Sequence, residues 1–153
     1  IVSFMSKKLA AKQFEDIICL EGYEGQHYFK NCIRAPKELA LQSLTDLVDS
    51  LFVPAMVTLD YYDLQQVVQG TENRIAYFQG KSDADKDELK NFLVGKNVKR
   101  CMVNIMGDID MLKASELMAE ITQIDPEAPI GVMPLDFGGD TVSVMVIYRD
   151  MAV

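Results

Sequence analysis

Two aspartates, Asp60 and Asp63, stand three residues apart in the segment TLDYYDL. An aspartate before or inside the first turn of a helix accepts hydrogen bonds from free backbone N–H groups and suits the positive end of the helix dipole. A pair of carboxylates can also form half of an active site. No histidine, metal ligand or glycine-rich loop lies near this pair in the sequence, so the residues alone favour helix capping.

Other residues with chemical potential give weaker signals. His27 is the only histidine, which excludes a zinc site built on histidines and any catalytic scheme that needs two of them. The Gly-Lys-Ser sequence at 80–82 resembles the end of a phosphate-binding loop, but Ile75 stands where that motif needs its first glycine. Residues 21–25 carry two acids and two glycines without the further oxygen ligands of a calcium loop. The sequence therefore predicts neither a metal site nor a phosphate loop.

Composition limits the possible partners. The chain has 153 residues, of which 49% are hydrophobic and 25% charged, so it can bury one core and form one compact domain. Its formal net charge is −8 and its basic residues do not cluster, so we do not expect a nucleic-acid partner. No apolar run approaches the roughly 18 residues that span a bilayer, so we do not expect direct membrane insertion.

The cysteines and the first residues bear on the compartment. The sequence has three cysteines, Cys19, Cys32 and Cys101. Their odd number and the absence of metal-type spacing favour buried thiols in a reducing cytoplasm. No signal peptide is evident. The chain begins with Ile1, so it is a fragment, a processed chain, or a protein whose natural start is Met5. We expect a cytoplasmic protein.

The hydrophobic pattern predicts the elements that position the aspartates. Apolar residues recur at helical spacing over residues 37–51, with Pro36 at the first helical position, and predict a long amphipathic helix. A shorter helix is predicted from near Asp60 to about Gln69, with Gly70 at its end.

After this second helix, short apolar runs alternate with helical patterns. Strands are predicted at residues 74–78, 100–106, 130–135 and 141–148. A helix within 80–95 is expected to turn Leu89, Phe92 and Leu93 inward, and a helix capped by Asp110 is expected to bury Met111, Ala114, Ser115, Met118 and Ile121. The glycines of residues 136–140, DFGGD, predict a hairpin between the last two strands.

The predicted fold class is α+β, a four-stranded mixed sheet with helices packed on one or both faces, preceded by the long amphipathic helix. Residues 1–34 are less regular, and could hold a strand and loop or the edge of another domain.

Residues 35–64 resemble the FtsZ branch of the FtsZ/tubulin family. In that family a long helix between two domains leads through a proline into a loop with the pattern Asn-x-Asp-x-x-Asp, and the spacing from Ala35 to Pro54 and on to Asp60 fits without a gap. The later segments RCMVNIMGDIDM and DPEAPIGVMPLDFGGDTVSVMVIYRD are similar to the family's LVNI-G strand, its following helix, its P-A-I-GA strand and its final strand. The resemblance covers roughly residues 35–150.

The resemblance implies a domain organisation and a role. Residues 1–34 are an uncertain segment that could be the edge of a nucleotide-binding domain, residues 35–57 the connecting helix and loop, and residues 58–153 the C-terminal domain. In such proteins one subunit holds GTP, and the loop of the next subunit in a filament supplies aspartates that orient the attacking water. Asp60 and Asp63 correspond to those aspartates, and Thr58 stands where the family usually has asparagine.

The same resemblance implies cofactors and partners. The family's GGGTGSG-type loop is missing from this sequence, so GTP and Mg²⁺ are expected only through a nucleotide-binding domain that this chain does not contain. The chain carries half of a GTPase site at most, and no GTPase activity is expected from it alone. Its expected partners are an FtsZ-like GTP-binding domain or a neighbouring subunit, in a homo-oligomer or filament.

Two alternatives stay open. The first is a stand-alone FtsZ-like interaction or scaffold module without a catalytic role, which a true start at Met5 favours. A glycine-rich nucleotide domain encoded upstream of Ile1 favours the activating domain instead. The second alternative, a small metabolic enzyme on an α+β sheet, has no catalytic constellation to support it.

Overall fold

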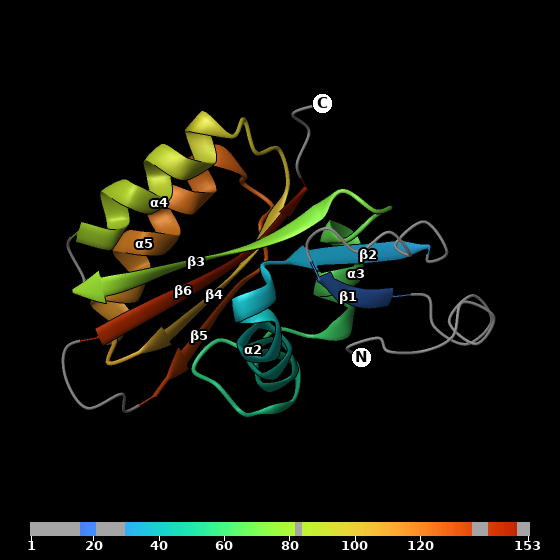
Figure 1. Cartoon of the computed structure of the whole chain (residues 1–153). Coiled ribbons are helices and arrows are strands. Elements are labelled where there is room, and N and C mark those ends of the chain that lie inside the picture. The colour runs from blue at the N-terminus through green and yellow to red at the C-terminus, as the bar shows by residue number, and fades with distance from the viewer. Residues whose placement is uncertain (1–15, 21–29, 82–83, 136–140, 150–153) are drawn as a thin grey trace.

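The computed structural model describes residues 16–20, 30–81, 84–135 and 141–149. In this part of the chain six strands form one sheet in the order β1-β2-β3-β6-β4-β5 (Figure 1). The strands are β1 (Asp16–Leu20), β2 (Asn31–Ala35), β3 (Asn73–Lys81), β4 (Cys101–Gly107), β5 (Ile130–Pro134) and β6 (Thr141–Arg149).

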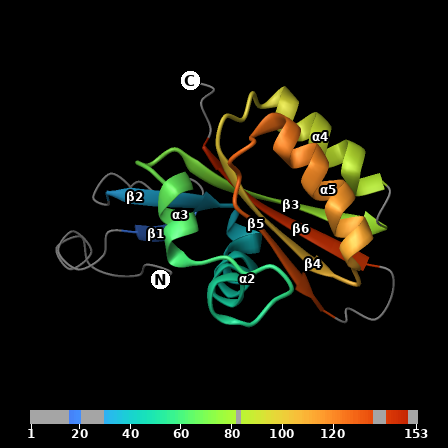
Figure 2. The same cartoon turned by 180° about the vertical axis from the view of Figure 1, so that it is seen from behind.

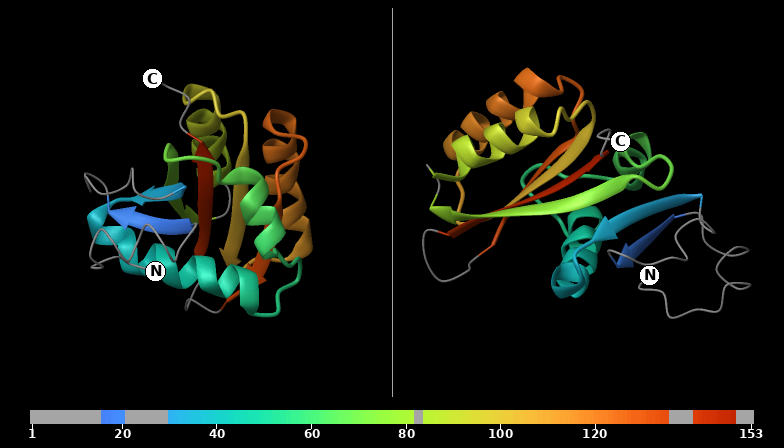
Figure 3. Two further views of the ribbon diagram at one scale, coloured as in Figure 1. Left: turned by 90° about the vertical axis from the view of Figure 1, so that its right-hand side faces the viewer. Right: turned by 45° about the horizontal axis from the view of Figure 1, so that its top comes forward.

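Helices cover both faces of the sheet. They are the 3₁₀ turn η2 (Lys37–Leu39) and the helices α2 (Ala40–Phe52), α3 (Tyr61–Val67), α4 (Ala84–Gly95) and α5 (Met111–Ile124). The helices α4 and α5 lie on one face, and α2 and α3 lie on the other (Figures 1 and 2). The right-hand view of Figure 3 shows α4 and α5 above the strands and α2 below them. The predicted α+β class is confirmed.

The mixed character of the sheet is also confirmed, but the predicted number of strands is wrong. The pairs β1/β2, β2/β3 and β4/β5 are parallel, whereas β6 runs antiparallel to both β3 and β4. The four predicted strands are the contiguous set β3-β6-β4-β5, and β1 and β2 extend it at one side. The sequence pattern did not predict β2, which is five residues long and includes the polar residues Asn31 and Arg34.

The predicted hairpin between the last two strands is wrong. Residues 136–140 themselves lie outside the described part of the chain, but the strands on either side of them, β5 and β6, are not neighbours, because β4 lies between them. The connection through α5 brings β5 parallel to β4, as a helical crossover does. The next strand, β6, then pairs antiparallel with β3 and β4 in the middle of the sheet, which explains why residues 142–148 are all buried.

Both faces of the sheet are apolar, as predicted for the strand at 100–106. Along β4, Cys101, Val103 and Ile105 pack toward α4 and α5, and Met102 and Met106 pack toward α2 and α3. The predicted inward residues of α4 are confirmed: Leu89 and Leu93 are buried, and Phe92 is partly buried against them.

The start of α5 is confirmed, but its predicted buried stripe is partly wrong. Asp110 is the N-cap residue, and its Oδ1 accepts a 2.9 Å hydrogen bond from the backbone N–H of Lys113. Ala114, Leu117 and Ile121 are the buried residues of the helix. Met111 and Ser115, which were expected to be buried, are exposed, because the buried face is turned toward Leu117.

The prediction of buried thiols is confirmed for one cysteine and wrong for another. Cys101 is a free, buried thiol, and burial raises its pKa to about 12, with the charge of Asp125 adding to the shift. Cys32 is disulfide-bonded. The side chain of Cys19 lies outside the described part. Among the described residues no helix is both long and apolar enough to cross a bilayer.

A half-buried polar pair holds α2 on the sheet. The hydroxyl of Tyr77 in β3 donates a 2.9 Å hydrogen bond to Oδ2 of Asp46 in α2. Burial raises the pKa of Asp46 and outweighs the hydrogen bonds from Tyr77 and Gln42, which lower it. Burial also raises the pKa of Tyr77, and the neighbouring Asp46 charge adds to that shift. The tyrosine therefore remains a donor at neutral pH.

We expect Asp46 to make the protein less stable as pH rises. Its folded pKa lies above the ordinary value of 3.8, so the folded state binds more protons, and this contribution is present below about pH 4 and lost as pH rises through the folded pKa. Asp46→Asn keeps an oxygen acceptor for Tyr77 and removes the titration. The free energy of unfolding of this variant, minus that of the unaltered chain, should increase between about pH 4 and 7 in urea titrations.

The exposed Asp108 provides the control, because Asp108→Asn makes the same chemical change without a buried partner. If the free energy of unfolding of Asp46→Asn differs from that of the unaltered chain by the same amount at every pH, the carboxyl group has the same pKa in the folded and unfolded states.

Candidate functional site

Asp60 and Asp63 form a reciprocal capping box at the start of α3. The backbone N–H of Asp63 donates to Oδ1 of Asp60, and the backbone N–H of Asp60 donates to Oδ2 of Asp63, both at 2.9 Å. The predicted helix start is confirmed. Asp60 is exposed and Asp63 is partly exposed. Each carboxylate uses one oxygen in this box, so its other oxygen can accept a hydrogen bond from water or from a partner.

The chain that leads to Asp60 is fixed to the edge of the sheet. Val57 forms a β-bridge with Val132 of β5, in which Val132 N–H donates to Val57 O at 2.9 Å. From Val57 onward the side chains alternate, so that Leu59 is buried while Thr58 and Asp60 are exposed. Within the described residues no hydrogen bond joins Thr58 to either aspartate. The structure therefore brings Asp60 and Asp63 into contact and places Thr58 beside them.

Leu59 packs where Gly131 leaves room for it. A Cβ atom on Gly131 would lie 2.8 Å from Leu59 Cδ1 and 2.7 Å from Asn104 Oδ1. Asn104 is itself 1% exposed, on the same face of β4 as Met102 and Met106. The sequence pattern did not reveal the role of Gly131. The available signal was a glycine inside an apolar strand, which often marks a close approach.

The far end of α3 is held by two arginines. Arg149 of β6 donates through Nη2 to the backbone oxygen of Val67 at 3.3 Å. Arg100 donates through Nη2 to Gln66 Oε1 at 3.4 Å and through Nη1 to Glu127 Oε2 at 2.9 Å. Cationic side chains at this end suit the negative end of the helix and the last carbonyl groups, which have no partner within the helix.

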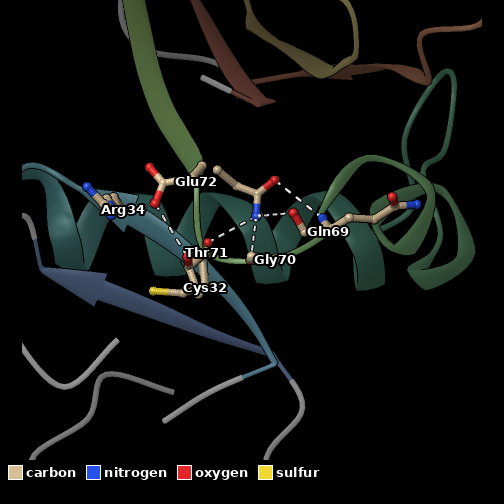
Figure 4. Close-up of polar contacts among 7 residues, drawn as sticks. Cys32, Arg34, Gln69, Gly70, Thr71 and Glu72 are labelled. Carbon is tan, nitrogen blue, oxygen red and sulfur yellow. Dashed lines mark hydrogen bonds and ion pairs between the residues drawn. The ribbon is translucent and has the colours of Figure 1, made fainter. Parts of the chain in front are cut away.

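The turn that follows α3 is organised by Asn73, whose side chain is fully buried. Its Nδ2 donates to the backbone oxygens of Gly70 at 2.9 Å, Cys32 at 3.1 Å and Gln69 at 3.4 Å. Figure 4 labels the three residues that accept these bonds. Figure 4 also shows Arg34 beside Glu72, an ion pair of 3.0 Å. No pattern in the sequence distinguished this asparagine, because its partners are backbone groups.

Two hollows lie elsewhere. One, of about 450 Å³, is at the ends of β4 and β5 and is lined by Gly107, Asp108, Ile109, Pro134 and Leu135. The other, of about 120 Å³, is lined by Gln42, Asp46, Gln79, Met106, Thr141 and Ser143. Neither includes Asp60 or Asp63, and no cluster of three metal-ligating side chains occurs among the described residues. His27 and residues 21–25 lie outside them.

The fold has relatives among solved structures. No protein-family model matches the sequence, and no curated protein matches it. A mutant FtsZ of M. jannaschii aligns with 90% of this chain at a TM-score of 0.61 and 14% identity. CetZ of Methanosaeta thermophila aligns with 90% at 0.61 and 13% identity, and CetZ2 of Haloferax volcanii, in a GTPγS-bound protofilament, with 93% at 0.57 and 10% identity.

The chain has an FtsZ/tubulin-like fold. It spans 57% of the FtsZ chain and 52% of the Methanosaeta CetZ chain. This partial coverage agrees with the FtsZ-like C-terminal domain expected from the sequence. At these identities the likeness concerns the FtsZ/tubulin-like fold alone.

The capping box should contribute to stability through its acceptors and not through its charge. Asp60→Ala removes the acceptor for the Asp63 N–H and should cost ~1 kcal/mol in the free energy of unfolding, whereas Asp60→Asn keeps an oxygen there and should change it by less than ~0.5 kcal/mol. Urea titration measures both. Asp60→Ala and Asp63→Ala together should cost less than the sum of the single changes, because they disrupt one reciprocal unit. Strict additivity would mean that the two bonds form independently.

The close approach at Gly131 gives a second stability prediction. Gly131→Ala places a Cβ atom against Leu59 and Asn104. It should lower the free energy of unfolding by roughly 1–3 kcal/mol, as overpacking does. Gly95→Ala is the matched control, because nothing lies within 4 Å of a Cβ built there. Its effect should stay within about 0.5 kcal/mol. Equal effects of the two substitutions in urea titrations would show that the Leu59 contact is not tight.

Proposed function

We propose that this chain is the C-terminal activating and polymerisation domain of an FtsZ-like, filament-forming GTPase. In this proposal Asp60 and Asp63 complete the GTP site of a neighbouring subunit, and Thr58 lies beside them at the family's asparagine position. The observation that carries the proposal is the capping box, which holds two accessible carboxylates in one orientation on an FtsZ/tubulin-like fold.

The chemistry requires a partner. Cleavage of a phosphoanhydride depends mainly on positioning and on electrostatic stabilisation of the transferred phosphoryl group. A neighbouring GTP-binding domain would present the γ-phosphate together with Mg²⁺. The free oxygens of Asp60 and Asp63 would accept hydrogen bonds from a water molecule and hold it in line with that phosphate. The chain alone would bind no GTP.

The proposal extends to assembly and location. The edge of a nucleotide domain would comprise residues 1–34. The connecting segment would comprise residues 35–57, and the activating domain residues 58–153. Stacking of subunits would form each site between two of them, so that hydrolysis depends on the filament. A protein of this kind would act in the cytoplasm during cell division.

A stand-alone interaction or scaffold module is the second candidate, and exposed apolar side chains favour it. Leu41, Val48 and Phe52 recur on the outer side of α2 and are 74%, 44% and 77% exposed. Tyr61 and Tyr62 next to the capping box are 48% and 66% exposed. Aromatic and apolar residues of this kind are common at the centres of protein interfaces. In that case the two aspartates only start a helix.

Phosphate release in the presence of a GTP-binding domain of the FtsZ type tests the proposal. The unaltered chain should accelerate release, while Asp60→Asn and Asp63→Asn should lower the acceleration by roughly 10²-fold, because the amide keeps the cap but aligns and polarises water less well than a carboxylate. Circular dichroism and urea titration check that both variants stay folded.

Asp108→Asn is the matched control, since Asp108 is an exposed aspartate away from α3, and it should leave the acceleration unchanged. Full acceleration by both cap variants would contradict a role in trans and favour the scaffold. Tight binding of GTP to the chain alone would contradict the proposed division of the site.

A further inference from the structure

The orientation of the aspartate pair depends on how α3 is held. This helix has seven residues and buries only Leu64 and Val67. Isolated helices of this length are not stable in water, so the surroundings must fix both its formation and its direction. Its first end is attached through Val57 and Leu59, as described above. Its second end has no such bridge and passes directly into the turn before β3.

Gly70 in that turn binds β2 through both of its backbone groups. Gly70 has φ of +74°, in the left-handed region that suits glycine. Its oxygen accepts from Cys32 N–H at 2.9 Å, and its N–H donates to Asn31 Oδ1 at 2.9 Å. Gly70 is therefore fixed to β2 by its donor and its acceptor.

Asn73 closes the turn from the inside. Its Nδ2 reaches Gly70 O, Cys32 O and Gln69 O, and its Oδ1 accepts from Gln69 N–H at 3.4 Å. The amide has two hydrogens for three oxygens, so the 3.4 Å contact to Gln69 O is the weakest. A buried side chain that both donates and accepts is needed here. Aspartate lacks the donor and leucine lacks both, whereas asparagine satisfies the turn without a charge.

We propose that Asn73 is a positioning residue for the Asp60–Asp63 pair. By fixing Gln69 and Gly70 to β2, it sets where α3 ends, and the direction of the helix then sets where the free carboxylate oxygens point. The Arg149 contact to Val67 supports the same end from β6. The catalytic part of this inference rests on the proposed function, and the structural part does not.

Two variants test it. Asn73→Asp is nearly isosteric and removes the donors, but it buries a carboxyl group and can destabilise the whole fold. Gly70→Ala is the second variant, because its Cβ would meet nothing within 4 Å and its cost is confined to the positive φ of the turn. Gly95→Ala, also without a neighbour within 4 Å, is the matched control.

The first measurement is amide hydrogen exchange, which needs no nucleotide. In both variants the N–H groups of Asp60 and Asp63 should exchange at least about tenfold faster, while the amides of β4 stay protected, because local opening of a short helix does not require unfolding of the sheet. Gly95→Ala should leave the Asp60 and Asp63 amides unchanged. Unchanged exchange at both aspartates in a folded Gly70→Ala variant would overturn the inference.

The second measurement separates positioning from docking in the phosphate-release assay. The maximal acceleration should fall by roughly 10- to 100-fold, because small displacements of a catalytic group are costly, while the concentration of chain that gives half of the maximum should stay within about twofold. A changed half-maximal concentration with an unchanged maximum would overturn the role in aiming. If the unaltered chain gives no acceleration, the proposed function fails, and the exchange data alone decide whether Asn73 orients α3.

Discussion

The reciprocal hydrogen bonds between Asp60 and Asp63 are the interaction on which the candidate site depends. Each carboxylate is attached to the backbone of the same helical turn, so neither side chain can reorient without breaking a cap. The orientation of α3 therefore determines where the free carboxylate oxygens point. A helix of seven residues is not stable by itself, so contacts with the surrounding structure must fix its orientation.

The sheet meets this constraint from several strands at once. Val132 of β5 binds the segment before α3. Arg149 of β6 reaches the backbone oxygen of Val67 at the end of the helix, and Asn73 at the start of β3 closes the turn after it. In the sequence β3 lies far from β5 and β6, and the order β1-β2-β3-β6-β4-β5 places the three strands in one sheet. Because β6 lies between β3 and β4, Arg149 at the end of β6 can contact the end of α3.

Local patterns in the sequence predicted what is determined locally. The helix that starts at Asp60, the cap at Asp110 and the apolar strand β4 follow from short-range periodicity and capping chemistry. The sequence did not reveal β2, the separation of β5 from β6, or the roles of Gly131 and Asn73. These depend on pairing and packing between distant segments, for which the residue types give no local signal.

The charge around the pair explains why it would need a partner to act. The chain has a net charge of −8, and no ion pair with either aspartate occurs among the described residues. Two carboxylates that solvent can reach repel a bare phosphate. In the proposed function they would approach GTP after Mg²⁺ and the positive groups of another surface had neutralised it, and their remaining charge would then act on water. In the proposed function, this charge would disfavour binding of nucleotide by the chain alone and would suit the pair to complete a site that a neighbour has already filled.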